Sequence, residues 1–185
     1  FPILKPMSEI AGKLAPQIAA NFLQKQYGGP GLLIGGTSNI KPLNISIIGA
    51  GIVGYNAAII SNGMGANVTV FDIDNNKLLN IKNYDKKIKT QFSSKGNLAK
   101  YLPSSHIIIN GVYIPGSKTP KVIDESIQKL IKKDTLIIDV AIDQGGGVAN
   151  LNSTISTVML YLIFQALYLR QQAKPLMKLL INISN

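Results

Sequence analysis

The sequence of 185 residues contains no cysteine, no tryptophan, one histidine and one arginine. Without cysteine, no disulfide framework, cysteine-ligated zinc site or thiol nucleophile is possible. His106 alone cannot build a multi-histidine metal site, so no metal is expected. Eighteen of the nineteen basic side chains are lysine and only Arg170 is arginine. The net charge of +10 therefore indicates compositional bias, because a nucleic-acid-binding surface would favour the bidentate guanidinium group.

Long hydrophobic runs are also scarce. The N-terminal stretch carries Lys5 inside a short apolar start and has no apolar core of the secretory-signal type. The most apolar run, Val158 to Leu169, is broken by Gln165 and is shorter than the ~20 residues that a membrane span needs. With 46% hydrophobic and 15% charged residues, the composition is globular. We expect a cytoplasmic protein without a membrane or nucleic-acid partner.

Short apolar strands alternate with helical stretches over most of the chain. Pro6 to Gln26 carries apolar residues at a spacing of four and predicts a helix with Ser8 as its N-cap. Strands are expected at Asn44 to Ile48, Asn67 to Phe71, Ile88 to Phe92, Ile107 to Gly111 and Thr135 to Ala141. Helices are expected at Val53 to Met64, Asn76 to Tyr84, Gly96 to Leu102, Asp124 to Ile131 and about Thr154 to Arg170. The pattern predicts an α/β fold with a doubly wound parallel sheet of the Rossmann type, flanked by N-terminal and C-terminal helices.

A glycine-rich motif, Gly49-Ala50-Gly51-Ile52-Val53-Gly54, directly follows the first expected strand and opens the next helix. In this setting Gly49 makes the tight turn, Gly51 lets a pyrophosphate approach the backbone, and Gly54 lets the helix pack closely on the strand. Free amides at the helix N-terminus would donate hydrogen bonds to the pyrophosphate. The motif predicts that this loop binds a dinucleotide.

An acidic residue, Asp72, ends the second expected strand, twenty-three residues after Gly49. This is close to the spacing of ~20 residues at which a carboxylate binds the ribose hydroxyls of a dinucleotide. A carboxylate there repels a 2′-phosphate and so favours NAD over NADP. The alternative makes Asp72 a turn or N-cap residue for a helix starting near Asn75.

Three further polar residues lie near strand ends. Asp139 and Asp143 lie at the end of the last expected strand, before Gly145 and Gly146. Since doubly wound sheets bind ligands outside the carboxyl ends of their strands, these carboxylates are placed to face the nicotinamide, or alternatively they form an Asx-turn. His106 begins its strand at the amino edge, and we interpret it as a structural or surface histidine.

Several segments together resemble the alanine dehydrogenase family, which is related to the NAD-binding subunit of proton-translocating transhydrogenases. The matching segments are Pro6 to Gly12, Gly49 to Ala58, Asn62 to Ala66, Asp72-Ile73 with Lys77-Leu78, Pro115 to Lys121 and Ala141 to Gly146. Gly-Tyr-Asn-Ala-Ala at 54–58 and Ala-Ile-Asp-Gln-Gly-Gly at 141–146 are not general Rossmann features. The resemblance implies reversible, NAD-dependent conversion of L-alanine to pyruvate and ammonium by hydride transfer.

The resemblance also implies roles for individual residues, with Asp143 as the catalytic carboxylate. The phosphates would be contacted by Ser8 and by the loop residues Gly49, Ala50, Gly51, Ile52, Val53 and Gly54. The adenosine side would be contacted by Asp72, Lys77, Ser93, Val112 and Tyr113. The nicotinamide side would be contacted by Val140, Ala141, Ile142, Asp143, Val148, Ala149, Asn150 and Leu151.

The sequence departs from the family in two places. It begins where the family's cofactor domain begins, so we expect the substrate domain, with its catalytic histidine and substrate-binding lysine and arginine, to be absent. It also passes directly from Gly147 to Val148, where the family has a stretch that includes a cofactor-binding arginine. We expect a linker helix at 1–28, an NAD(H)-binding Rossmann domain at 29–151 and a helical segment at 152–185.

The resemblance leaves three functional interpretations. The first is the NAD(H)-binding domain of an alanine dehydrogenase, which forms a homo-oligomer and does not turn over alanine without a substrate domain. The second is the NAD-binding subunit of a transhydrogenase. The third is a non-catalytic or truncated nucleotide-binding remnant.

Overall fold

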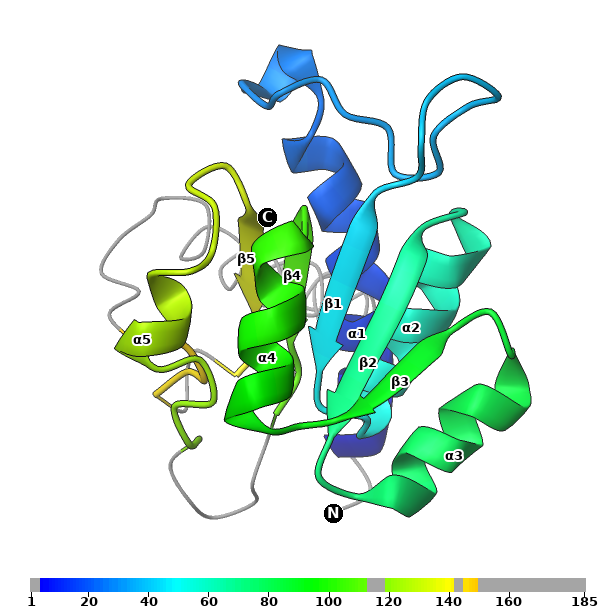
Figure 1. Cartoon of the computed structure of the whole chain (residues 1–185). Coiled ribbons are helices and arrows are strands. Elements are labelled where there is room, and N and C mark those ends of the chain that lie inside the picture. The colour runs from blue at the N-terminus through cyan, green and yellow to red at the C-terminus, as the bar shows by residue number, and fades with distance from the viewer. Residues whose placement is uncertain (1–3, 113–118, 142–144, 150–185) are drawn as a thin grey trace, which may run out of the picture.

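A five-stranded parallel sheet organises the computed structural model, which describes residues 4–112, 119–141 and 145–149 (Figure 1). The strands are β1 (Asn44–Ile48), β2 (Asn67–Asp72), β3 (Lys89–Phe92), β4 (Ile107–Asn110) and β5 (Leu136–Asp139). Their order is β3-β2-β1-β4-β5, with every neighbouring pair parallel. The chain thus reverses its direction of winding between β1 and β4, which confirms the predicted doubly wound α/β fold.

Helices cover both faces of the sheet. Three pack on one face: α1 (Leu4–Phe22), α2 (Ile52–Gly63) and α3 (Asn75–Tyr84). The other face carries α4 (Lys95–Tyr101) and the single-turn α5 (Glu125–Gln128). The 3₁₀ turns η1 (Lys25–Tyr27) and η2 (Leu102–Ser104) complete the described elements. No helix within the described ranges is long and apolar enough to cross a membrane, and the predicted segment 152–185 lies outside those ranges.

The sheet separates two hydrophobic clusters. Ile47 packs with α1, α2 and α3, whereas the next residue, Ile48, packs with α4 and α5. The same alternation holds in β4, where Ile107 and Ile109 face the first cluster and Ile108 faces the second. Because successive side chains point to opposite faces, a strand covered on both sides needs apolar residues at every position. This explains why β1, β4 and β5 were predictable as isoleucine-rich runs.

The first helix differs from its prediction in its limits and in its buried face. It includes Leu4, so Ser8 lies inside the helix and the predicted N-cap role is wrong. Pro6 falls in the first turn, where proline is tolerated and does not stop the helix. Gly12 is buried against α2, and a Cβ there would lie 2.3 Å from the carbonyl oxygen of Val53. This close crossing holds the start of α1 near the carboxyl ends of the strands (Figure 1).

Other boundaries differ by a few residues, as is common at element ends. The predicted helix from Asp124 to Ile131 is regular only over Glu125–Gln128, with Asp124 as its N-cap. The predicted strand from Thr135 to Ala141 is regular over Leu136–Asp139. It stops there because the Ala141 amide donates a hydrogen bond to the Asp139 side chain at 3.1 Å, which turns the chain out of the sheet.

Asp85 joins the C-terminal ends of α2 and α3. Its contacts predict that the stability of the fold depends on pH. Its carboxylate accepts hydrogen bonds of 2.8 Å from the Lys87 amide and 2.8 Å from the Asn62 side chain. First the Lys87 amide and then Asn62 hold the pKa of Asp85 below its ordinary value of 3.8. A lowered folded-state pKa stabilises the fold at neutral pH, and this contribution is lost as pH falls below 3.8 through the folded-state pKa.

We therefore expect Asp85→Asn to lower the melting temperature at neutral pH. The difference from the wild-type protein should shrink as the pH falls below 3.8 and the wild-type carboxyl group becomes protonated. Thermal unfolding followed by circular dichroism at several pH values measures both. A melting-temperature difference that stays constant across this range would contradict the role assigned to the carboxylate.

Candidate functional site

The glycine-rich loop makes a tight connection between β1 and α2. Gly49 has a φ of +94°, a conformation that disfavours residues with a side chain, and its amide donates a 2.7 Å hydrogen bond to the Phe71 carbonyl oxygen. A Cβ at Gly49 would also lie 3.1 Å from the backbone of Gly111. Glycine at this position therefore lets the loop turn sharply between the ends of β2 and β4.

The other two motif glycines meet different surroundings. A Cβ at Gly54 would lie 1.7 Å from the carbonyl oxygen of Gly49, so α2 packs directly on the loop. A Cβ at Gly51 would meet no atom within 4 Å. The hydrogen bonds within the helix begin with the Tyr55 amide, which donates to the Gly51 carbonyl oxygen at 2.9 Å. The amides before Tyr55 in the first turn therefore have no acceptor within the helix. Open space thus lies beside amides that can bind an anion.

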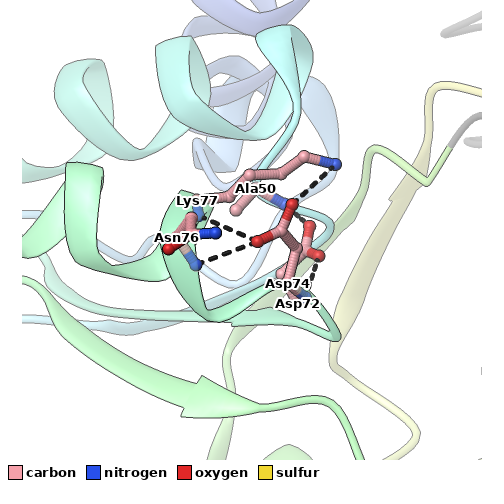
Figure 2. Close-up of polar contacts among 5 residues, drawn as sticks. All are labelled: Ala50, Asp72, Asp74, Asn76 and Lys77. Carbon is pink, nitrogen blue, oxygen red and sulfur yellow. Dashed lines mark hydrogen bonds and ion pairs between the residues drawn. The ribbon is translucent and has the colours of Figure 1, made fainter.

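Asp72 connects the end of β2 to this loop (Figure 2). It is 8% exposed. Its carboxylate accepts hydrogen bonds of 2.5 Å from the Ala50 amide and 2.8 Å from the Asp74 amide. The turn alternative is therefore correct in part, while the N-cap of α3 is Asp74. Since a carboxylate offers about four acceptor positions, Asp72 retains capacity for the two hydroxyls of a ribose.

Lys77 lies in the first turn of α3 beside Asp72 (Figure 2). Its ammonium group is 4.0 Å from the Asp74 carboxylate, and both side chains are about half exposed. Such exposed pairs contribute little to stability. The lysine is therefore free to reach toward a ligand at the end of β2.

The described residues among the remaining predicted contacts gather at the carboxyl ends of the strands. Ser93 follows β3, and its amide donates to the Asp72 carbonyl oxygen at 2.9 Å. Val112 follows β4, while Val140 and Ala141 follow β5. Half-buried Ser8 comes from the start of α1. Five predicted residues lie outside the described ranges, namely Tyr113, Ile142, Asp143, Asn150 and Leu151.

A buried network around Asp139 joins β4, β5 and the segment 145–149. Asp139 is 5% exposed. One carboxylate oxygen accepts from the Asn110 side chain at 2.9 Å and the Ala141 amide at 3.1 Å. The other accepts from the amides of Gly147 at 2.7 Å and Val148 at 3.3 Å. The Asx-turn alternative is thus correct for Asp139, but the turn is only one of four contacts.

Two members of this region were missed by sequence reasoning. Asn110 could have been found, because it ends a run of isoleucines and a polar side chain buried there needs a partner. In the structure it is fully buried. Lys121 had no such signal, since a single lysine is usually a solvated charge. Its ammonium group donates to the carbonyl oxygens of Gly145 and, at 3.1 Å, Val148.

His106 lies at the opposite, amino edge of the sheet. Its Nδ1 accepts a 3.0 Å hydrogen bond from the Asn44 amide, and its own amide donates to the Asn44 carbonyl oxygen at 2.9 Å. The structural interpretation of this histidine is confirmed. Over the described ranges, no group of three or more His, Cys, Asp or Glu side chains is arranged to hold a metal ion.

The strand order, the glycine turn after β1 and the buried carboxylate after β2 define a domain of the Rossmann type. The sequence model of the family described as alanine dehydrogenase/PNT, C-terminal domain, matches residues 15–167. The chain belongs to this family.

Individual relatives agree with this assignment. The alanine dehydrogenase of Methanococcus maripaludis is 41% identical over 153 residues, and that of Mycobacterium tuberculosis is 43% identical over 147 residues. These alignments cover 82% and 79% of the chain but 41% and 40% of the relatives. The chain therefore spans about two-fifths of the length of these curated relatives.

Solved structures show the same relationship. An L-alanine dehydrogenase superimposes with a TM-score of 0.78 at 36% identity, over 83% of this chain and 43% of that one. A transhydrogenase from Sinorhizobium meliloti superimposes with a TM-score of 0.71 at 17% identity, over 93% of this chain and 56% of that one. The second likeness extends to the fold alone.

Proposed function

We propose that the chain is the NAD(H)-binding domain of an alanine dehydrogenase, an enzyme that reversibly converts L-alanine to pyruvate and ammonium. The observation that carries this proposal is the hydrogen bond from the Ala50 amide to the Asp72 carboxylate, in a chain of this family. It joins the phosphate loop to an acceptor for the adenosine ribose. A homo-oligomeric assembly remains a prediction from the family resemblance.

The residues present fit a dinucleotide with a 2′-hydroxyl. The open space beside Gly51 admits a pyrophosphate, which the amides of Ile52 and Val53 would bind. Asp72 would accept the ribose hydroxyls and disfavour a 2′-phosphate, and Lys77 would lie on the same adenosine side. NAD, when bound, supplies the hydride acceptor. Val140, Ala141, Val148 and Ala149 would border its nicotinamide half.

Turnover of alanine requires more than this cofactor site. A general acid or base must reach the reacting group, and His106, the only histidine of the sequence, is held by Asn44 at the opposite edge of the sheet. Asp143, the proposed catalytic carboxylate, lies outside the described ranges. We infer that binding of alanine or pyruvate depends on a substrate domain.

The 185-residue chain should therefore bind NADH without oxidising alanine. Because it contains no tryptophan, the intrinsic fluorescence of the nicotinamide reports binding directly. The expected result is a saturable fluorescence change with NADH, and no alanine-dependent NAD reduction in an absorbance assay. Absence of any change at millimolar NADH would reject the proposal and favour a nucleotide-binding remnant. Alanine-dependent reduction would show that this chain carries the complete catalytic machinery.

A further inference from the structure

The buried carboxylate of Asp139 connects three parts of the site that are separate in the sequence. Asp139 ends β5 and is paired in register with Asn110 at the end of β4. Its four hydrogen bonds reach Asn110, Ala141, Gly147 and Val148. The carboxylate thus holds the backbone on both sides of residues 142–146, where the chain leaves β5 and where it returns.

Asp139 binds the amides of the returning segment, while Lys121 binds its carbonyl oxygens. Val148 pairs with Ile123 through an isolated bridge, in which the Ile123 amide donates to the Gly147 carbonyl oxygen at 3.0 Å and the Ala149 amide donates to the Ile123 carbonyl oxygen at 2.8 Å. Gly147 packs so closely on the sheet that a Cβ would lie 2.3 Å from the Asn110 side-chain nitrogen. The Asn110 nitrogen in turn donates to Asp139 at 2.9 Å. The segment is therefore seated on a two-residue polar platform at the ends of β4 and β5.

The strand order places this platform opposite the adenosine side. Asp72 ends β2, on one side of β1, whereas Asn110 and Asp139 end β4 and β5 on the other side. A dinucleotide bound across the reversal point between β1 and β4 has its two halves on these opposite sides. Asp139 therefore lies on the nicotinamide side.

We propose that Asp139 is a positioning residue for the nicotinamide half of the cofactor. It fixes the Ala141 and Val148 amides, and thereby the backbone that borders the ring. This inference rests on the proposed function. It assigns Asp139 no contact with the cofactor, because each of its oxygens accepts two hydrogen bonds from the protein, which together use the about four acceptor positions of a carboxylate.

The test compares NAD with ADP-ribose, which lacks only the nicotinamide ring. In Asp139→Asn, the side-chain NH₂ group replaces one of the two acceptor oxygens and meets groups that themselves donate, so the backbone shifts at Ala141 or at Gly147 and Val148. Isothermal titration calorimetry should show NAD binding weakened by about ten-fold or more, the effect of losing roughly one buried hydrogen bond. ADP-ribose binding should stay within about two-fold of the wild-type value, since the Asp72 side is untouched.

Asp85→Asn is the matched control, because it makes the same substitution at a carboxylate remote from the platform, and it should change neither affinity. If Asp139→Asn does not fold, Gly147→Ala is the second variant that tests the positioning role. Its Cβ displaces the same segment from Asn110 and leaves the carboxylate in place. It should give the same selective loss of NAD binding.

Equal weakening of NAD and ADP-ribose, or no weakening of either, would overturn the positioning role. Failure of the proposed function looks different. In that case the wild-type chain binds neither NAD nor ADP-ribose, and both the proposed function and the role of Asp139 are rejected. Wild-type binding of both ligands without a difference between them in the variants would reject the role of Asp139 alone.

Discussion

Replacing Gly54 with alanine is expected to destabilise the domain severely. The added Cβ would lie 1.7 Å from the carbonyl oxygen of Gly49, a backbone atom in the tight turn between β1 and α2. No rotamer change can relieve this overlap, so α2 must move away from the sheet. Overpacking typically costs about 1–3 kcal/mol, and contact with backbone places this substitution at about 3 kcal/mol or more. For a domain of this size, the melting temperature should fall by about 6–12 °C.

Gly51→Ala is the matched control in the same loop. It is expected to retain stability and to lose NADH affinity. A Cβ at Gly51 meets no protein atom, and its φ of −69° suits alanine. The melting temperature should therefore remain within about 2 °C of the wild-type value. NADH affinity should nevertheless fall by about ten-fold or more, since the Cβ fills the space through which a pyrophosphate approaches the amides.

Thermal unfolding and NADH titration of both variants separate the two roles. Loss of stability in Gly51→Ala with retained NADH affinity would show that the open side of the loop does not face the cofactor. A melting temperature of Gly54→Ala equal to that of the wild-type protein would contradict the close packing of α2. Gly54→Ala should also lose NADH binding, because the displaced helix carries the loop amides with it.

The features that were predictable from the sequence are those whose causes lie close together along the chain. Burial on both faces makes β4 an uninterrupted run, Ile107, Ile108 and Ile109, which is visible without any tertiary information. The phosphate loop needs its glycines at fixed spacing because one short turn must satisfy a positive φ, an open face and a close helix contact. Asp72 could be found because the next strand in sequence is also the neighbour of β1 in the sheet.

Contacts between distant segments were not predictable in the same way. Asn110 and Asp139 are 29 residues apart, and they meet because β4 and β5 pair in register. The sequence allowed an Asx-turn at Asp139 but held no sign of its bonds to Gly147 and Val148. Ser8 failed as an N-cap for a related reason. Its capping tendency is local, whereas the start of α1 depends on helix propagation through Pro6 and on packing against α2.

The second large effect is expected on binding, in Asp72→Ala. The carboxylate would accept two ribose hydroxyls, and hydrogen bonds to a charged acceptor each contribute about 1.5–3 kcal/mol. The substitution also frees the Ala50 amide, which Asp72 holds at 2.5 Å in the phosphate loop. NADH affinity should therefore fall by at least about 30-fold, measured by nicotinamide fluorescence.

Asp85→Ala controls for the loss of an aspartate near α3, because Asp85 also accepts two hydrogen bonds but lies at the other end of that helix. It should leave NADH affinity unchanged.

The NADPH affinity distinguishes a direct role of Asp72 in binding the cofactor from a role in holding the glycine-rich loop. Removing the carboxylate abolishes its repulsion of a 2′-phosphate, so the preference for NADH over NADPH should narrow in Asp72→Ala. Equal weakening of both nucleotides would instead assign Asp72 to holding the loop, with no role in selecting the cofactor.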